Sequence, residues 1–136
     1  SRSAMDPAER GGVELDQIVK LLVAAGYFRA RLTRLCVFDR VIGGLAWCLA
    51  SCRSEDSDVD LAFHEESSIG QKVHIGEAIE RALRQVKCPL GLQAHQLSGL
   101  DLAAILPVTR WLVAEALAMR HDRESSVRRA SHEYFA

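Results

Sequence analysis

Two aspartates two residues apart, Asp58 and Asp60, are the side chains of this sequence best spaced for metal chemistry. They belong to a segment in which polar residues alternate with the apolar residues Val59, Leu61 and Phe63. Such alternation is typical of a half-buried strand, on which residues i and i+2 share one face. Two carboxylates on one face can hold magnesium ions for reactions at phosphate groups. The pair is therefore the first candidate for a catalytic site.

The glycine pair Gly43-Gly44 precedes Asp58 by fourteen residues, an order that is similar to the signature of the nucleotidyltransferase superfamily. In that family a Gly-Ser turn at a helix N-terminus holds the triphosphate. Here Leu45 stands in place of the serine, and the glycines lie inside a helical repeat. A third carboxylate could come only from Asp101, which is better placed to precede a helix. A minimal nucleotidyltransferase that uses Asp58 and Asp60 is kept as an alternative to a solvated strand face.

Calcium and zinc fit the sequence less well than magnesium. An EF-hand loop would begin at Asp56, but its sixth position is Leu61 instead of glycine and its twelfth is Ser67 instead of glutamate. The cysteines lack the closely spaced pairs that hold structural zinc. We therefore expect no metal, no cofactor and no catalytic residue, with reduced thiols in apolar surroundings at Cys36, Cys48, Cys52 and Cys88.

The composition favours one compact domain without a strong electrostatic field. The chain has 136 residues, 49% of them hydrophobic and 26% charged, with a formal net charge of -1. A near-neutral balance does not attract nucleic acid or anionic membrane over the whole surface. No apolar run approaches the roughly 20 residues that span a bilayer, and no signal sequence is recognisable. We expect a cloning remnant at 1–7, one domain at 13–120, and a terminal helix or linker at 121–136 that leads to an absent coiled coil.

Apolar residues recur at helical spacing in the N-terminal half, which predicts two helices joined by a loop. Residues 15–25 form the first helix, and Gly26 can end it in the left-handed conformation. Residues 38–52 form the second, in which each glycine of the Gly43-Gly44 pair costs about 1 kcal/mol. That cost is usually accepted where another backbone comes close. The loop between the helices is expected to cover the core with Tyr27, Phe28, Leu32 and Leu35.

The C-terminal half adds further helices after a short edge strand or extended loop at 57–64. Ser67 or Ser68 can cap a third helix that Pro89 stops. Residues 90–100 form a loop or short turn, and Pro107 suits the first turn of the last core helix. The third helix is expected to bury the face that carries Ile69, Val73, Gly76, Ile79, Leu83 and Val86, and the last helix the face of Val108, Trp111, Leu112 and Ala116. The fold class is thus mainly α, a helical bundle with at most a short β-hairpin or edge strand near 58–63.

Five segments in this order resemble the N-terminal domain of the coiled-coil domain-containing protein 93 family. The segments are LDQIVKLLVAAGYFRARL, FDRVIGGLAWCL, DVDLAFHEESSIGQKV, KCPLGLQAHQLSGLDL and ILPVTRWLV. The resemblance runs from about Leu15 to about Ala118. It implies a calponin-homology-like fold, a helical bundle that serves as a non-catalytic docking module of a coiled-coil scaffold.

The resemblance also implies partners and a location. The family pairs with coiled-coil domain-containing protein 22 and a ring of COMMD proteins, in an assembly that acts with retriever to recycle endosomal cargo. We therefore expect a cytoplasmic chain that is peripheral to endosomes, with no nucleic-acid ligand and no direct membrane insertion. Related domains in kinetochore and ciliary proteins bind microtubules or tubulin, which is the alternative function.

Two charged segments are candidate contact surfaces for a protein partner. The basic segment runs from Arg29 to Arg40 and has a local excess of positive charge that could attract acidic tubulin tails. The simpler explanation is that these arginines serve solubility and snorkel over the core. The acidic segment runs from Asp58 to Glu66. The partner-binding residues predicted in the two segments are Arg29, Arg31, Arg34, Arg40, Asp58, Asp60, Glu65 and Glu66.

Overall fold

The computed structural model describes the chain over residues 7–52 and 57–135, with side chains described for 12–52 and 57–122. Over these residues the regular elements are all helical, which confirms the mainly α fold class. The elements are α1 (Pro7–Ala25), the 3-10 turn η1 (Phe28–Arg31), α2 (Val37–Cys52), α3 (Ile69–Gln85), α4 (Ala94–Ser98) and α5 (Leu102–Phe135).

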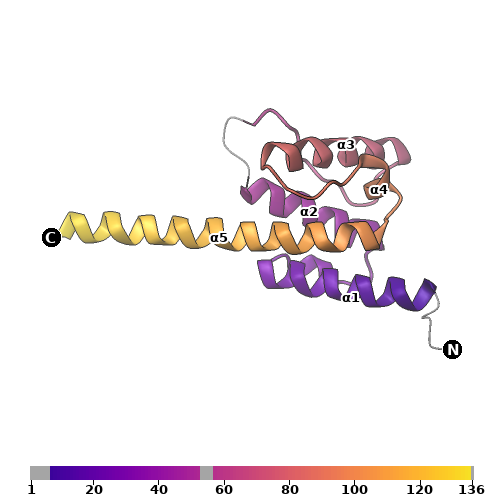
Figure 1. The fold of residues 1–136 in the computed structure, drawn as a ribbon, viewed down its shortest axis with the longest axis horizontal. Helices are drawn as coiled ribbons and strands as arrows, with labels where there is room; N and C mark the ends of the chain where they lie inside the picture. The colour runs from indigo at the N-terminus through magenta and orange to yellow at the C-terminus, as the bar shows by residue number, and fades with distance from the viewer. Residues whose placement is uncertain (1–6, 53–56, 136) are drawn as a thin grey trace.

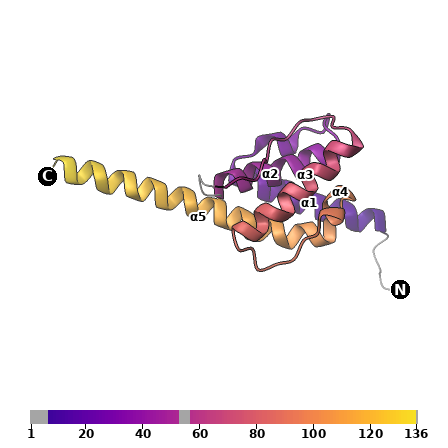
Figure 2. The same ribbon diagram turned by 90° about the horizontal axis from the view of Figure 1, so that it is seen from above.

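The helices form a bundle around the first half of α5. Helix α5 packs on α1 and α2, α3 lies on the other side of α2, and the short α4 packs on α3 and on α5 (Figure 1). The second half of α5 extends beyond the other elements in both views (Figures 1 and 2). The core between the helices consists of aliphatic side chains, and the largest of the fully buried ones are Ile18, Leu22, Ile42, Leu45, Leu49, Ile79, Leu97, Ile105 and Leu112.

The possible strand near 58–63 does not form, because these residues find no neighbouring strand within the described parts of the chain. The segment is extended, and its predicted alternation of burial is correct: Val59 and Leu61 are buried, whereas Asp58 and Asp60 are exposed. The Ala62 amide donates to the Asp60 carboxylate at 2.9 Å, which satisfies one backbone group without a sheet.

The ends of α1 and α3 follow their capping signals. Gly26 follows α1 with a φ of 110°, the left-handed conformation predicted for it. Ser68 caps α3, and its side chain and that of Gln71 bond reciprocally to each other's backbone amide.

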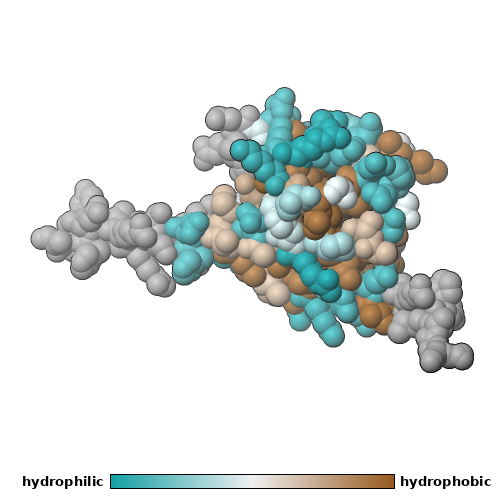
Figure 3. Space-filling view, viewed as in Figure 1, coloured by the Kyte–Doolittle hydropathy of each residue, from teal (hydrophilic) through white to brown (hydrophobic). Residues whose placement is uncertain are grey.

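One expectation for α3 is wrong, because Ile69 and Val73 are 82% and 45% exposed instead of buried. Figure 3 shows apolar side chains at the right-hand end of α3, where this helix begins.

The last helix begins earlier than predicted. Helix α5 starts at Leu102, so Pro107 lies beyond the first turn, and α4 occupies part of the predicted 90–100 loop. Asp101 precedes α5 as expected and accepts the Ala104 amide with its side chain at 3.3 Å. Asp101 thus acts as the N-cap of α5, which explains why the helix starts before the predicted position.

Part of α5 meets the length and composition of a membrane span, which corrects the expectation that no such run exists. Leu102–Asp122 covers 21 residues with a mean hydropathy of 1.5. The same segment packs on α1 and α2 and buries Ile105, Val108 and Leu112 in the core. Its apolar composition is therefore explained by its central position in the bundle.

Candidate functional site

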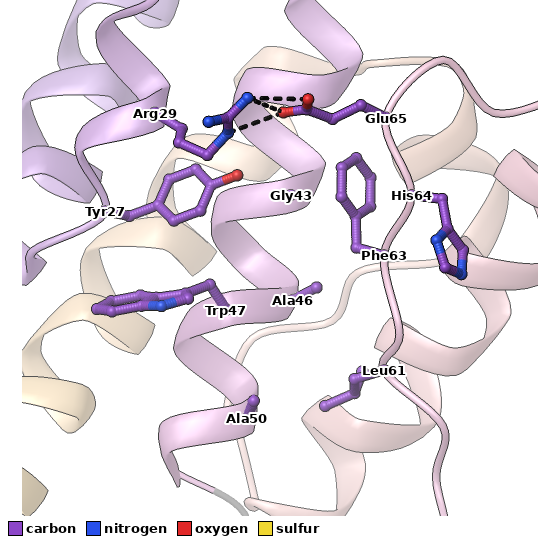
Figure 4. A pocket seen from close by; sticks show the side chains of 10 residues that line it. All are labelled: Tyr27, Arg29, Gly43, Ala46, Trp47, Ala50, Leu61, Phe63, His64 and Glu65. Carbon is purple, nitrogen blue, oxygen red and sulfur yellow. Dashed lines mark hydrogen bonds and ion pairs between the residues drawn. The ribbon is translucent and has the colours of Figure 1, made fainter.

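A groove of about 640 Å³ opens over one face of α2 (Figure 4). Its floor consists of the small residues Gly43, Ala46 and Ala50, which lie three and four positions apart and so share a helix face. One wall comes from η1 and α2, and the other from the extended segment before α3. The remaining lining residues are Tyr27, Arg29, Trp47, Leu61, Phe63, His64 and Glu65.

Aromatic rings form much of both walls. The rings of Tyr27 and Trp47 lie with centroids 5.7 Å apart on one side. Phe63 stands on the other side, where it stacks on Phe38 at 6.4 Å. A Cβ atom at Gly43 would lie 2.6 Å from the Tyr27 hydroxyl oxygen and 2.9 Å from Phe63 Cε1. The absence of a side chain at Gly43 thus lets both rings approach the helix. The groups that come close to Gly43 are side chains, whereas a neighbouring backbone was expected.

An ion pair closes one end of the groove. The Arg29 guanidinium donates from Nε to Glu65 Oε2 and from Nη2 to Glu65 Oε1, both at 2.9 Å. The two side chains are 47% and 32% exposed, so the pair contributes at most about 1 kcal/mol to stability. The two charged segments predicted as separate contact surfaces therefore meet at this point, and Glu65 neutralises Arg29.

Beside the ion pair, the buried carboxylate of Asp39 fixes the same segment to the first turn of α2. Asp39 is 1% exposed, and its Oδ2 accepts the Glu66 amide at 3.1 Å. Glu66 has a φ of 60°, an uncommon conformation that this hydrogen bond helps to hold. Among the described residues, Asp39 Oδ1 has no hydrogen-bond partner. Asp39 therefore positions the segment that carries Glu65 and Phe63.

The other predicted arginines differ in how they are used. Arg40 is half-buried and donates from Nε to the Ala30 carbonyl at 2.8 Å, which fastens η1 to α2. Arg31 lies over the exposed Phe28 ring, 5.4 Å from its centroid. Arg34 is exposed after η1. The expectation that Phe28 covers the core is wrong, since this side chain is 59% exposed.

The geometry required for nucleotidyl transfer is not present in the described residues. Gly43 and Gly44 are buried inside α2 and do not begin it, and Asp58 and Asp60 lie on an extended segment without a sheet beneath them. Asp58 accepts a hydrogen bond from Gln85 at 3.4 Å. The transferase alternative is therefore wrong for this fold. Asp56, the first position of the calcium alternative, lies outside the described residues.

Nor do histidine, cysteine and acidic side chains gather into a group of three that could hold a metal ion, within the part of the chain that the structure describes. Asp60, His64 and His74 line one smaller hollow of about 250 Å³ without forming such a group.

Burial raises the pKa of two groups near the groove. The pKa of Tyr27 is raised by burial and then by the Glu65 charge, and that of Cys48 is raised to about 12 by burial and then by Cys52.

The sequence pattern missed most of the groove. Tyr27 is buried as expected and also lines the groove, whereas nothing in the sequence pattern marked the half-buried Trp47 as a groove residue. Of the eight predicted partner-binding residues, only Arg29 and Glu65 line it. The signal that could have found the site is the glycine pair inside a helix, because such a pair requires that other groups come close.

Comparison with known proteins assigns the family. The family model of the CCDC93 protein N-terminal domain matches residues 9–118. Coiled-coil domain-containing protein 93 of Mus musculus is 46% identical over 127 residues, which are 93% of this chain and 20% of that protein. The Homo sapiens protein is 45% identical over the same lengths, and the Dictyostelium discoideum homolog is 39% identical over 120 residues, 88% of this chain and 19% of that protein.

The chain thus spans about a fifth of the length of the curated relatives it matches. The match covers the whole bundle from α1 to the part of α5 that packs in the core. This chain therefore belongs to the coiled-coil domain-containing protein 93 family, in which it corresponds to the N-terminal domain.

Proposed function

We propose that this chain is a non-catalytic docking domain that binds a partner protein through the groove over α2. The observation that carries the proposal is the composition of the groove walls. Tyr27, Trp47 and Arg29 belong to the three residue types that contribute most often to binding energy at protein interfaces. Here the half-buried Trp47 and the exposed Arg29 line an open groove beside the buried Tyr27, and the groove has a volume typical of binding pockets.

The relatives support a scaffold role, because their names describe coiled-coil proteins and no enzyme. In the longer protein, this domain would precede the coiled coil and hold a partner beside it. We propose further that the scaffold belongs to the endosomal recycling assembly of COMMD proteins and coiled-coil domain-containing protein 22. This finer proposal, with a cytoplasmic location peripheral to endosomes and a calponin-homology-like fold, rests on the resemblance of the family segments.

Tubulin binding has less support from the surface charge. A basic patch for acidic tails would need its arginines free, but Arg29 is paired with Glu65 and Arg40 is bonded to the backbone of η1. Two exposed arginines, Arg31 and Arg34, remain in this region. The tubulin alternative is therefore an outcome to be measured beside the docking function.

The test is capture of purified partners by the immobilised 136-residue chain. The probes are the complex of COMMD proteins with coiled-coil domain-containing protein 22, and polymerised microtubules. We expect the complex to be retained, and retention to fall when Arg29, Arg31 and Arg34 are all changed to Glu. A control with the same change of charge on or just after α3 replaces Arg81, Arg84 and Lys87 by Glu and should retain the complex.

Retention of microtubules alone, lost in the first variant and weakened for the wild-type chain by added salt, would replace the docking proposal by the cytoskeletal alternative. Retention of neither probe by the wild-type chain would contradict both functions. Circular dichroism of each variant checks that the charge changes leave the helical content intact.

A further inference from the structure

The extended segment before α3 lies between two hollows of the surface. Phe63 and His64 line both the groove over α2 and the smaller hollow of about 250 Å³, which His74 and Ile75 of α3 bound on its other side. In Figure 4 the Phe63 ring stands on the side of the segment that faces α2, and the His64 ring on the opposite side. These two residues therefore form the partition between the groove and the hollow.

The middle of this segment is held less firmly than its ends. Val59 and Leu61 are anchored in the core with 5% and 7% exposure, and at the other end Ser68 caps α3. Residues 62–66, here called the gate, are exposed except for the half-buried Phe63. Within the described residues, no backbone–backbone hydrogen bond involves the gate. The gate can thus leave its position without breaking a main-chain bond to either helix.

Three contacts hold the gate against the bundle. The Arg29–Glu65 ion pair is partly exposed, so water and salt weaken it. The Glu66 amide donates to the Asp39 carboxylate at 3.1 Å. The third contact is the Phe63 ring, which packs on the face of α2 where a glycine leaves room for it.

The closed position of the gate also has two unfavourable features. Glu66 has a φ of 60°, which a residue other than glycine rarely adopts. Asp39 Oδ1 is buried without a hydrogen-bond partner among the described residues. Opening would release Glu66 from this conformation and admit water to Asp39. The free-energy difference between the closed and the open position is therefore smaller than the three contacts alone would give.

We propose that residues 62–66 act as a gate that moves away from α2, with Leu61 and Ser68 as its fixed ends, and joins the two hollows into one cleft. With the gate closed, the groove ends at Phe63. With the gate open, the cleft continues to His74 and Ile75 on α3 and offers a longer surface to a bound segment. The motion belongs to the free domain, so the inference goes beyond the docking function and does not depend on which protein binds.

The experiment is NMR relaxation dispersion on the backbone amides of the free wild-type chain, which detects motion between microseconds and milliseconds. We expect the amides of residues 62–66 to share one exchange rate constant. The amides of Ala46 and Ile75 should show the same rate constant, because these residues line the groove and the hollow on the two sides of Phe63. Val59, which is anchored in the core, should show no exchange.

Arg29→Gln removes the ion pair and leaves the Asp39 bond in place. Because all gate contacts open together, hydrogen exchange of the Glu66 amide should become faster by up to about fivefold, although Arg29 does not touch this amide. The open population measured by relaxation dispersion should rise by the same factor. Arg31→Gln is the matched control in η1, because Arg31 lies over the Phe28 ring, and it should change neither quantity.

A second variant acts on the ring contact. The Cβ atom of Gly43→Ala would lie 2.9 Å from Phe63 Cε1, so this variant should favour the open position more than Arg29→Gln does. The inference is overturned if the gate amides share no exchange process, if Ala46 and Ile75 do not sense it, or if Arg29→Gln leaves exchange of the Glu66 amide unchanged. Capture of a partner by the wild-type chain is measured separately, so the docking function can fail while the gate stands, and the reverse.

Discussion

Gly44 illustrates at the residue scale how a glycine in a helix is explained by its neighbours. A Cβ atom there would lie 2.5 Å from Cδ1 and 2.9 Å from Cδ2 of Leu22, a residue of α1 that is fully buried. Leu22 therefore has no free space into which it can move. The two glycines thus allow close packing on two faces of α2. The face of Gly44 packs against α1, and the face of Gly43 forms part of the groove floor beneath Tyr27 and Phe63.

We predict that Gly44→Ala destabilises the domain. The gain of about 1 kcal/mol in helix propensity is outweighed by an overpacking cost of about 1 to 3 kcal/mol. The free energy of unfolding, measured by urea denaturation, should fall by up to about 2 kcal/mol. Gly70→Ala is the matched control in α3, because nothing lies within 4 Å of its Cβ position, and it should be neutral or stabilising. Equal effects of the two substitutions would contradict this explanation.

At the scale of elements, the start of α3 depends on local side chains more than on burial. Its first turn carries Ile69, which is 82% exposed, so packing contributes little there. The Ser68 hydroxyl accepts the Gln71 amide at 3.2 Å, and the Gln71 side chain accepts the Ser68 amide at 2.8 Å. These two bonds satisfy amides that would otherwise lack a partner at the helix end.

Ser68→Ala should therefore lower the free energy of unfolding by about 1 kcal/mol. Hydrogen exchange should become faster mainly in the first turn of α3, since the rest of the helix is held by Ile75, Ile79 and Leu83 in the core. A double-mutant cycle with Gln71→Ala supplies the control, because the two residues act together and their effects should be less than additive. Additive effects would show that the two bonds act independently.

At the scale of the whole molecule, α5 runs from the centre of the bundle to a point well outside it (Figures 1 and 2). The helix has 34 residues, which corresponds to a length of about 51 Å. Its first half is the centre of the bundle, and its second half extends away from the other helices (Figure 2). Arg120 marks the transition, because it donates to the Ala25 carbonyl at 2.9 Å and so closes the C-terminal end of α1. A partner held in the groove is thus connected to this helix through α2 and α1.

The packed bundle also protects the fully buried thiol of Cys48, which makes stability dependent on pH. Its pKa is about 12 in the folded chain against 9.0 for an unburied thiol. Between these values only the unfolded chain loses the proton, so stability is fully present below pH 9 and falls as the pH rises toward 12. The loss from this thiol should be about 1.4 kcal/mol at pH 10.

Urea denaturation at pH 7 to 10, under reducing conditions, tests this dependence. The Cys48→Ala chain should lose less stability with rising pH than the wild-type chain, whatever constant difference the smaller side chain makes at pH 7. Cys36→Ala is the control, because Cys36 is exposed and its removal should leave the pH profile unchanged. Parallel profiles for the wild-type and Cys48→Ala chains would contradict the prediction.

The sequence by itself determined the helices and much of their burial. The spacing of apolar residues predicted the positions of α2 and α3 and the end of α1, whose start at Pro7 lies eight residues before the predicted Leu15. Alternation predicted the correct inner face at 57–64, although no strand forms there. Gly26, Ser68 and Asp101 marked helix ends because capping depends on residues a few positions away. These features are local, so a single sequence contains enough information to predict them.

Only the tertiary structure decided which segments meet. Arg29 and Glu65 are 36 residues apart, and no periodicity relates them. Trp47 lies in an apolar stretch of α2, but whether it is covered depends on what packs above this helix, and the extended segment leaves it half-exposed. Ile69 and Val73 share the helical repeat of α3 yet remain exposed, since the buried face of this helix begins only at Ile75. Periodicity identifies one face of an element, whereas a groove exists only between elements that packing has brought together.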